Sequence, residues 1–195
     1  MIEIIKKYFP QLTPKQEEQF AALDALYHDW NAKINVISRK DIDNLYEHHI
    51  LHSLAIAKCI TFREGTNVLD FGTGGGFPGI PLAIFFPEAN FKLIDGTGKK
   101  VRVAQEVADA IGLENVLPAH LRGEEEKGKF DFIVSRAVMP LPDLMKIVKK
   151  NIASDQHNLL PNGVIVLKGG NLDEELKPYK NICTFTEGNT FSNCK

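Results

Sequence analysis

The residue types that could bind a ligand gather after one short apolar segment of this 195-residue chain. Residues 67–71 are largely apolar and predict a buried strand, with Asp70 near its end, and residues 72–76 are all glycine apart from Thr73. Glycine lets the backbone turn sharply, and it lets a ligand lie against the main chain with no Cβ between them. Open α/β sheets bind their ligands where a strand ends and a helix begins. The sequence therefore predicts a ligand site at residues 70–76.

Two classes of cofactor fit such a turn, and the sign of the neighbouring charge separates them. Residues 74–79 match the dinucleotide pattern G-x-G-x-x-G, but this match begins four residues after Asp70 and contains Pro78. The alternative pattern, acidic-x-G-x-G-x-G, runs over residues 70–76 and includes Gly72 and Gly74. It places a carboxylate where it would repel a pyrophosphate and accept a hydrogen bond from a cationic ammonium group. We therefore expect S-adenosylmethionine, and not a nicotinamide dinucleotide, as the cofactor.

A second carboxylate supports a nucleoside without distinguishing the two cofactors. Asp95 closes the expected strand at residues 90–95 and follows Asp70 by 25 positions. Both cofactor classes use an acidic residue here to bind ribose hydroxyls. Asp95 is therefore a candidate cofactor-binding residue.

These residues need a sheet to position them, and strand and helix patterns alternate after residue 65. Strands are expected at residues 67–71, 90–95, 116–119, 130–135 and 164–168, and helices at residues 79–86, 99–111 and around 144–148. This alternation predicts a doubly wound, Rossmann-like α/β sheet with helices on both faces.

The first third of the chain predicts helices only. Thr13 and Pro14 are typical of a helix start, and apolar residues then recur at spacings of three and four. A second helical stretch is expected from about Asp41. We expect a small N-terminal helical cap over residues 1–64 and a Rossmann-like domain over residues 65–195, together one compact unit.

Composition limits the remaining possibilities. The chain is 44% hydrophobic and 25% charged, which is typical of a soluble globular protein. Its apolar runs fall well short of the roughly 18 residues that a membrane span needs. Three widely spaced cysteines favour a reducing cytoplasm over a disulfide framework. The formal net charge of -2 gives no global support for a nucleic-acid partner.

Three motifs resemble those of one known family. They are Gly-Thr-Gly-Gly-Gly-Phe-Pro-Gly-Ile-Pro at residues 72–81, Asp95 followed by Gly-Lys-Lys-Val-Arg at 98–102, and Ser-Arg-Ala at 135–137. Matches in the N-terminal part are Trp30, Asn31, residues 35–38 and residues 49–54. Over about residues 10 to 178 the chain resembles the RsmG family, also called GidB. The resemblance implies a bacterial class I S-adenosylmethionine-dependent methyltransferase that acts on N7 of a specific guanine in 16S rRNA of the small ribosomal subunit.

The resemblance also implies roles for single residues. Gly72 and Phe77 match positions that line the cofactor, and Gly123 and Glu124 match a loop that meets the adenine. Arg136 matches an arginine beside the reacting centre, where it would touch the cofactor and position the substrate. The basic residues that could face RNA phosphate are Lys99, Lys100, Arg102 and Lys168.

Arg136 is the expected catalytic residue, although methyl transfer to N7 needs few catalytic side chains. N7 carries a lone pair and no proton, so no general base is expected, and catalysis depends on alignment and electrostatics. The planar guanidinium could hold guanine O6 or a phosphate. Alternatively, it could form a salt bridge with Asp70, Asp95 or Glu124, and the sequence leaves both interpretations open.

Three histidines, His48, His49 and His52, fall in the second helical stretch. No acidic third ligand at a recognised spacing joins them, so we expect no metal site. One histidine is expected to be buried between the cap and the sheet, with the others solvated or in contact with RNA.

Three departures from the family pattern leave alternatives open. The family usually shows Asp-Ser-x-Gly-Lys, whereas Gly96 and Thr97 follow Asp95 here, and His52 stands where relatives often have Asp. The tail at residues 184–195 is unlike the family's closing strands and is expected to hold one short strand at most. The alternatives are a small-molecule methyltransferase, which the net charge favours, and a non-catalytic S-adenosylmethionine-binding protein, which the tail favours. No partner protein and no membrane association are evident.

Overall fold

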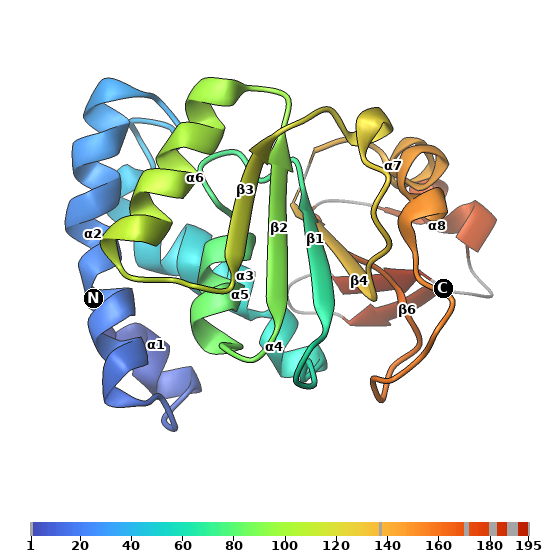
Figure 1. Ribbon diagram of the computed structural model, residues 1–195, viewed down its shortest axis with the longest axis horizontal. Coiled ribbons are helices and arrows are strands. Elements are labelled where there is room, and N and C mark those ends of the chain that lie inside the picture. Colours follow the sequence, from blue (N-terminus) through green and yellow to red (C-terminus); the bar gives the residue numbers. More distant parts are fainter. Residues whose placement is uncertain (1, 137, 170–171, 180–182, 187–190, 195) are drawn as a thin grey trace.

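The fold is an α/β sandwich built on one sheet (Figure 1), seen in a computed structural model that describes residues 2–136, 138–169, 172–179, 183–186 and 191–194. The described strands are β1 (Asn67–Phe71), β2 (Asn90–Asp95), β3 (Val116–His120), β4 (Phe132–Arg136), β5 (Gly163–Leu167), β6 (Cys183–Thr186) and β7 (Phe191–Cys194). They form a seven-stranded sheet of order β3-β2-β1-β4-β5-β7-β6, in which β1 to β5 are parallel. The expected Rossmann-like fold is confirmed.

Helices connect these strands and precede them. The α-helices are α1 (Ile2–Tyr8), α2 (Pro14–Lys33), α3 (His52–Leu54), α4 (Ile56–Cys59), α5 (Gly79–Phe85), α6 (Gly98–Ala110), α7 (Leu141–Val148) and α8 (Asp173–Leu176). Short 3₁₀ turns are η1 (Ile42–Asn44), η3 (Gly123–Glu125), η4 (Lys149–Asn151) and η5 (Lys177–Tyr179), and η2 (Leu45–Leu51) is a π-helix. None of the helices in the described ranges is long and apolar enough to cross a membrane.

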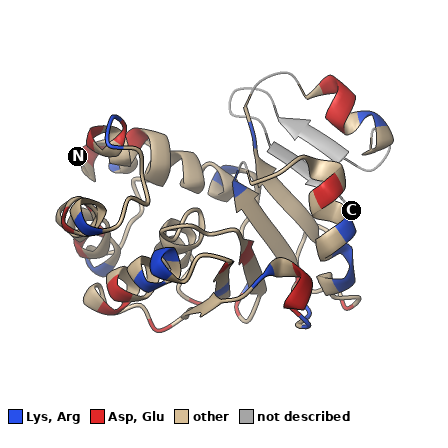
Figure 2. Cartoon of the chain, turned by 90° about the horizontal axis from the view of Figure 1, so that it is seen from above, with Lys and Arg blue, Asp and Glu red and all other residues tan. Residues whose placement is uncertain are grey.

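The strands bury both faces of the sheet, because successive side chains point to opposite sides. Val68, Phe132 and Val134 lie in a core with helices α1 to α6, whereas Leu69 and Ile133 lie in a second core with α7 and α8. Helices on both faces were expected, and this arrangement is confirmed. Figure 2 shows that most of the strand residues are uncharged, while basic and acidic residues are interspersed on the helices and loops.

The C-terminal edge corrects one expectation. The tail was expected to hold one short strand at most, but β6 and β7 both form, and β7 pairs antiparallel with both β5 and β6. Each strand has four residues, shorter than usual, so its local pattern is weak. The pairing of β7 with β5, and of β6 with β7, stabilises strands that the local sequence pattern only weakly predicts. The sheet therefore closes with an antiparallel edge pair.

The helical cap begins as the sequence predicts. Thr13 accepts the Gln16 N–H at its side chain, and the Gln16 side chain in turn accepts the Thr13 N–H, so a capping box starts α2. Phe20, Leu23 and Tyr27 from α2 are fully buried in the same core as the sheet. The sequence did not predict α1. The domain boundary between residues 64 and 65 stays a prediction.

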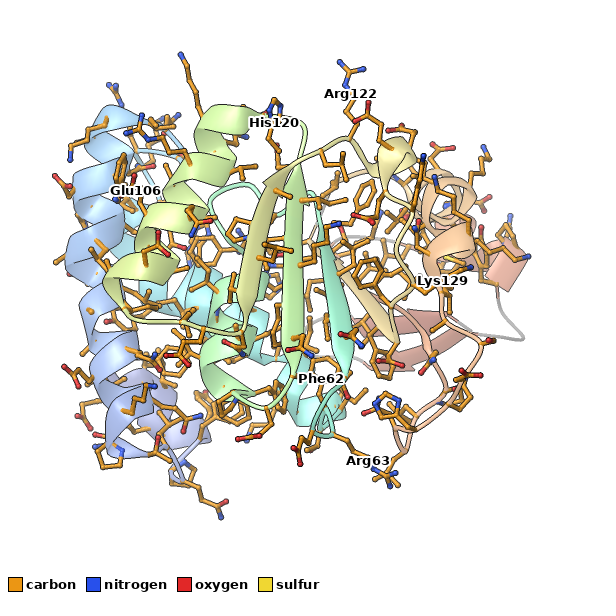
Figure 3. All side chains as sticks on the ribbon, in the orientation of Figure 1. Phe62, Arg63, Glu106, His120, Arg122 and Lys129 are labelled. Carbon is orange, nitrogen blue, oxygen red and sulfur yellow. The ribbon has the colours of Figure 1, made fainter. Side chains whose placement is uncertain are left out.

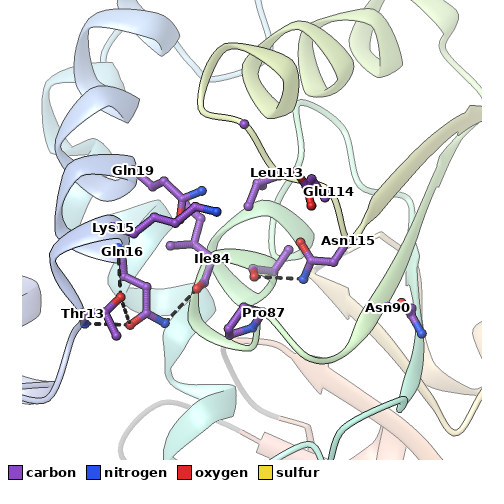
Figure 4. A pocket seen from close by; sticks show the side chains of 12 residues that line it. Thr13, Lys15, Gln16, Gln19, Ile84, Pro87, Asn90, Leu113, Glu114 and Asn115 are labelled. Carbon is purple, nitrogen blue, oxygen red and sulfur yellow. Dashed lines mark hydrogen bonds between the residues drawn. The ribbon is translucent and has the colours of Figure 1, made fainter.

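Amide side chains fix the cap and β3 to the end of α5. Figure 4 shows Gln16 and Asn115 lining a cleft beside this helix end. The Gln16 amide donates to the carbonyls of Ile84 and Phe85, at 2.9 and 3.1 Å. The Asn115 amide lies 2.9 to 3.1 Å from three carbonyl oxygens, which belong to Ala83, Phe86 and Ala89. Carbonyls at the end of a helix lack partners within it, so these amides satisfy them.

We expect Asn115→Ala to destabilise the fold by about 1–3 kcal/mol, because it leaves partly buried carbonyls without a donor. Urea unfolding measures this change. Asn90→Ala is the matched control, since Asn90 lines the same cleft but is exposed and makes one long hydrogen bond of 3.4 Å to Asn67. Equal stability losses in the two variants would contradict this account of the helix end.

Candidate functional site

The glycine-rich turn leaves β1 and is fastened to β2. The N–H groups of Gly72 and Thr73 both donate to the Ile94 carbonyl, at 2.9 and 3.0 Å. Gly72 and Gly74 have φ angles of 70° and 58°, which side chains with a Cβ rarely adopt. A Cβ on Gly72 would also lie 2.5 Å from the Val138 side chain. Glycine is therefore required at Gly72 for backbone conformation and for space.

A cavity of about 370 Å³ opens at the carboxyl ends of β1 and β2. It brings together four of the predicted cofactor residues, Gly72, Asp95, Gly123 and Glu124, although three separate loops carry them. The other lining residues are Phe71, Ile94, Gly96, Thr97, Leu121, Arg122, Val138 and Met139. Figure 3 shows Arg122 and His120 at this end of the sheet and Arg63 at the opposite end. The cavity lies where open α/β sheets bind ligands.

Gly123 forms part of the cavity wall by packing directly on Phe71. A Cβ on Gly123 would lie 1.9 Å from the Phe71 ring, a separation that two carbon atoms cannot have. Phe71 is 5% exposed and belongs to the second core, so its ring has little freedom to move. The close approach therefore depends on glycine.

Asp95 holds the turn and keeps capacity for a ligand. One carboxylate oxygen, Oδ2, accepts the Gly74 N–H at 2.9 Å, and the other, Oδ1, accepts the Thr97 N–H at 2.8 Å. An ionised carboxylate has about four acceptor sites, so each oxygen can accept a further hydrogen bond. Since Asp95 is half-buried and lines the cavity, ribose hydroxyls fit its remaining acceptor sites.

Asp70 lies beneath the turn and is fully buried. Its Oδ2 accepts hydrogen bonds from the Thr73 hydroxyl at 2.6 Å and the Gly79 N–H at 2.7 Å. Its Oδ1 has no hydrogen-bond partner in the described part of the chain. The carboxylate therefore organises the turn from below, and one acceptor atom stays unused. A direct contact with an ammonium group stays a prediction.

Burial raises the pKa of Asp70 from its ordinary value of 3.8 to about 7, although Thr73 and Gly79 oppose this change. The folded chain thus holds a proton that the unfolded chain releases, and stability falls as the pH rises from about 4 to about 7. We expect the wild type to lose roughly 3 kcal/mol more stability than Asp70→Asn across this range. Urea unfolding at several pH values measures the difference. Parallel pH profiles for the two proteins would contradict it.

Arg136 ends β4 and contacts the cap instead of a carboxylate. Its Nη2 donates to Nδ1 of His49 at 3.0 Å, and its Nη1 donates to the His48 carbonyl at 3.3 Å. The guanidinium carbon lies 5.2 Å from the centre of the Phe77 ring, a cation–π distance. Among the described residues Arg136 forms no salt bridge, so the alternative of an ion pair with Asp70, Asp95 or Glu124 does not occur in this structure.

The Phe77 ring faces the cap and not the cavity. Phe77 is 3% exposed, and its ring centre lies 4.8 Å from that of Tyr27 and 5.5 Å from that of His49. Phe77 does not line the cavity described above. In this structure the Phe77 ring stacks against the guanidinium of Arg136. Its predicted contact with the cofactor stays a prediction.

Comparison with known proteins decides the family. The chain matches GidB, described as rRNA small subunit methyltransferase G, over residues 16–194. The chain belongs to this family. The ribosomal RNA small subunit methyltransferase G of Bacteroides thetaiotaomicron is 70% identical over 92% of this chain and 87% of its own length. That of Phocaeicola vulgatus is 66% identical over 92% of this chain and 86% of its own length.

A solved structure supports the fold of this GidB-family chain. A SAM-dependent methyltransferase from Aquifex aeolicus superposes with a TM-score of 0.53 at 18% identity, covering 80% of this chain and 97% of that one. The resemblance inferred from the sequence motifs is thus confirmed at the level of the family. Ala137, which belongs to one of those motifs, lies outside the described residues.

The basic residues predicted to face RNA divide into two groups in this GidB-family chain. Lys99, Lys100 and Arg102 lie on the first turns of α6, which starts directly after cavity residue Thr97, and Lys99 and Arg102 are exposed. Lys168 lies elsewhere. It forms a largely buried ion pair with Glu175 and donates to the Met139 carbonyl at 2.7 Å, so it fastens the segment after β4.

Sequence reasoning missed several residues that shape the site. Thr73 and Val138 are among them, and so is Asp41, which binds both His48 and His49. A hydroxyl three residues after Asp70 is a local signal for a hydrogen-bonded turn. No comparable signal joins Asp41 to Arg136, because the fold alone brings them together.

Proposed function

We propose that this chain transfers a methyl group from S-adenosylmethionine to N7 of one guanine in 16S rRNA. Membership of the rRNA small subunit methyltransferase G family supports the rRNA substrate. The assignment of S-adenosylmethionine as cofactor rests on the cavity at the ends of β1 and β2, which Gly72, Asp95 and Gly123 line.

The cavity residues fit this cofactor in shape and charge. Gly72 and Gly123 allow the cavity wall to pack closely, because an added Cβ would collide with Val138 and Phe71, which line the same cavity. Asp95 would hold the ribose hydroxyls, and Glu124 and Gly123 would line the base. We assign the unpartnered Oδ1 of Asp70 to the ammonium group. When bound, S-adenosylmethionine supplies a methyl group on a sulfonium that any lone pair of suitable orientation can accept.

The chain's own residues then have to align the guanine. No general base is needed, because N7 has a free lone pair and carries no proton. Arg136 ends β4, two residues before cavity residue Val138, and its remaining N–H donors can hold guanine O6 or a phosphate. An arginine on N7 itself would oppose the positive charge that the product guanine gains, so Arg136 addresses another atom.

We place the substrate RNA on the surface beside α6. Lys99, Lys100 and Arg102 lie on the first turns of α6, which follows cavity residue Thr97, and can neutralise RNA phosphates. Arg102 also lies 3.7 Å from Glu106 in an exposed ion pair, whereas Lys168 is held by Glu175 in a largely buried one. A ribosomal substrate supports a cytoplasmic location for the protein.

Methyl incorporation tests this function. The purified chain is incubated with radiolabelled S-adenosylmethionine and, in separate reactions, unmodified small-subunit RNA, assembled small subunits, large-subunit RNA and a set of small methyl acceptors. We expect label only with the small-subunit substrates. Label in small molecules alone would favour a small-molecule methyltransferase, and cofactor binding without any transfer would favour a binding protein.

A further inference from the structure

A hydrogen-bonded chain of side chains joins the cap to the end of β4. Nη2 of Arg136 lies 3.0 Å from Nδ1 of His49, and Nε2 of the same imidazole lies 2.7 Å from Oδ2 of Asp41. His49 is 12% exposed and Asp41 is 33% exposed. Arg136 and His49 are 87 residues apart in the sequence, so only the packing of the cap on the sheet creates this contact.

The chemistry of these groups fixes the proton on His49. A guanidinium only donates, so Nδ1 of His49 must be the acceptor toward Arg136. Nε2 then carries the proton and donates it to the Asp41 carboxylate. We propose that Asp41 and His49 are positioning residues that hold the guanidinium of Arg136 against the Phe77 ring, ready for the substrate.

The surroundings favour the neutral imidazole that this arrangement requires. Burial and the charge of Arg136 lower the pKa of His49 below its ordinary value, while Asp41 opposes this effect. Hydrogen bonds from His48 and His49 lower the pKa of Asp41 to about 2, so the carboxylate stays ionised. The other charged or titratable groups that face His49 and Arg136 are His48, His52, Asp70 and Tyr27.

A pH-dependent effect follows from the geometry. Protonation of His49 would place an N–H on Nδ1, opposite the N–H of Arg136, and would leave that contact with two donors and no acceptor. Arg136 would then lose its orientation. The methylation rate should therefore fall toward acidic pH with the titration of His49.

Nitrogen NMR of the imidazoles tests the hydrogen-bonded chain directly, whether or not the protein methylates RNA. At about pH 7.5 we expect His49 to be neutral, with its proton on Nε2. The signal is assigned by its absence from His49→Asn. In a variant that combines Asp41→Ala with Arg136→Ala the ring should populate both neutral forms, because neither partner then fixes the position of the proton. A proton on Nδ1, or a doubly protonated ring at this pH, would overturn the inference.

Kinetics test the positioning role, and this part rests on the proposed function. We expect His49→Ala to lower kcat for rRNA methylation roughly tenfold, with the Kd for S-adenosylmethionine changed less than about twofold. His49→Asn keeps an oxygen acceptor close to the position of Nδ1 but does not titrate. It should recover most of the rate and lose the fall toward acidic pH.

The control is His52→Gln, which removes a neighbouring histidine that makes no hydrogen bond to Arg136 among the described residues. It should keep the acidic fall in rate. The proposal would be overturned if the methylation rate of His52→Gln no longer fell toward acidic pH while that of His49→Asn still did. A wild type that methylates no RNA would refute the proposed function instead, and the imidazole spectra would still decide the role of His49.

Discussion

Arg136→Ala should lower the rate of rRNA methylation about 100-fold or more, while the Kd for S-adenosylmethionine changes little. The guanidinium is held on two sides, by the His48 carbonyl and by Nδ1 of His49, and it lies over the Phe77 ring. Misplacing a substrate by about 1 Å can cost about 100-fold in rate, and removing the residue that aligns it should cost at least as much. Single-turnover methylation of small-subunit RNA measures this loss.

Arg136→Lys is a sharper version of the same test. Lysine keeps the positive charge but has neither the planar fork nor the ring-stacking surface of arginine. We therefore expect it to recover less than a tenth of the lost rate, which would separate geometry from charge.

Arg63→Ala is the matched control for Arg136, because Arg63 is exposed and lies at the opposite end of the sheet (Figure 3). Its rate should stay within about twofold of the wild type, as is usual for a surface substitution. An Arg136→Ala protein that is folded and methylates RNA at more than half the wild-type rate would rule out the role given to this residue.

The second large effect is expected at Gly123. Gly123→Ala would place its Cβ 1.9 Å from the Phe71 ring, and Phe71 is confined by the second core. Relief of this collision must move the loop that lines the cavity. Overpacking of this kind costs about 1–3 kcal/mol, which corresponds to a roughly 5-fold to 150-fold higher Kd if the strain falls on the bound state. Titration calorimetry with S-adenosylmethionine measures the Kd.

Gly169→Ala serves as the control for Gly123, since no atom of the described residues lies within 4 Å of its added Cβ and Gly169 does not line the cavity. Its Kd should equal that of the wild type within about twofold. If Gly123→Ala also binds within twofold of the wild type, the cavity is not the cofactor site.

The sequence predicts the part of the site that depends on local pattern. Asp95 and the glycines of the turn could be placed because a strand, a glycine run and a second strand end follow one another within a short segment. The side chain of Asp70 was harder to place. An acid at a strand end predicts a charge near the ligand, but whether it faces the ligand or the turn depends on Thr73 and Gly79, which occupy its Oδ2 here.

Contacts between distant segments account for what the sequence could not show. Lys168 was predicted to be a basic residue available to RNA phosphate, but in the fold it forms an ion pair with Glu175. The three histidines cannot be distinguished in the sequence, and only the packing of the fold brings the His49 side chain into contact with Arg136. One histidine was expected to be buried between the cap and the sheet, but His49 and His52 are both half-buried and His48 is exposed. The edge strands likewise depend on pairing, since β7 pairs with β5 and β6 pairs with β7.

The atom that receives the methyl group tests the central claim most directly. Small ribosomal subunits without base modification are methylated by the purified chain and then treated with borohydride and aniline, which break RNA at N7-methylguanine. Our account predicts one new chain break, at a single guanine of 16S rRNA, that requires both the protein and S-adenosylmethionine. Labelled RNA that resists this cleavage would contradict it, because the methyl group would then be on a different atom.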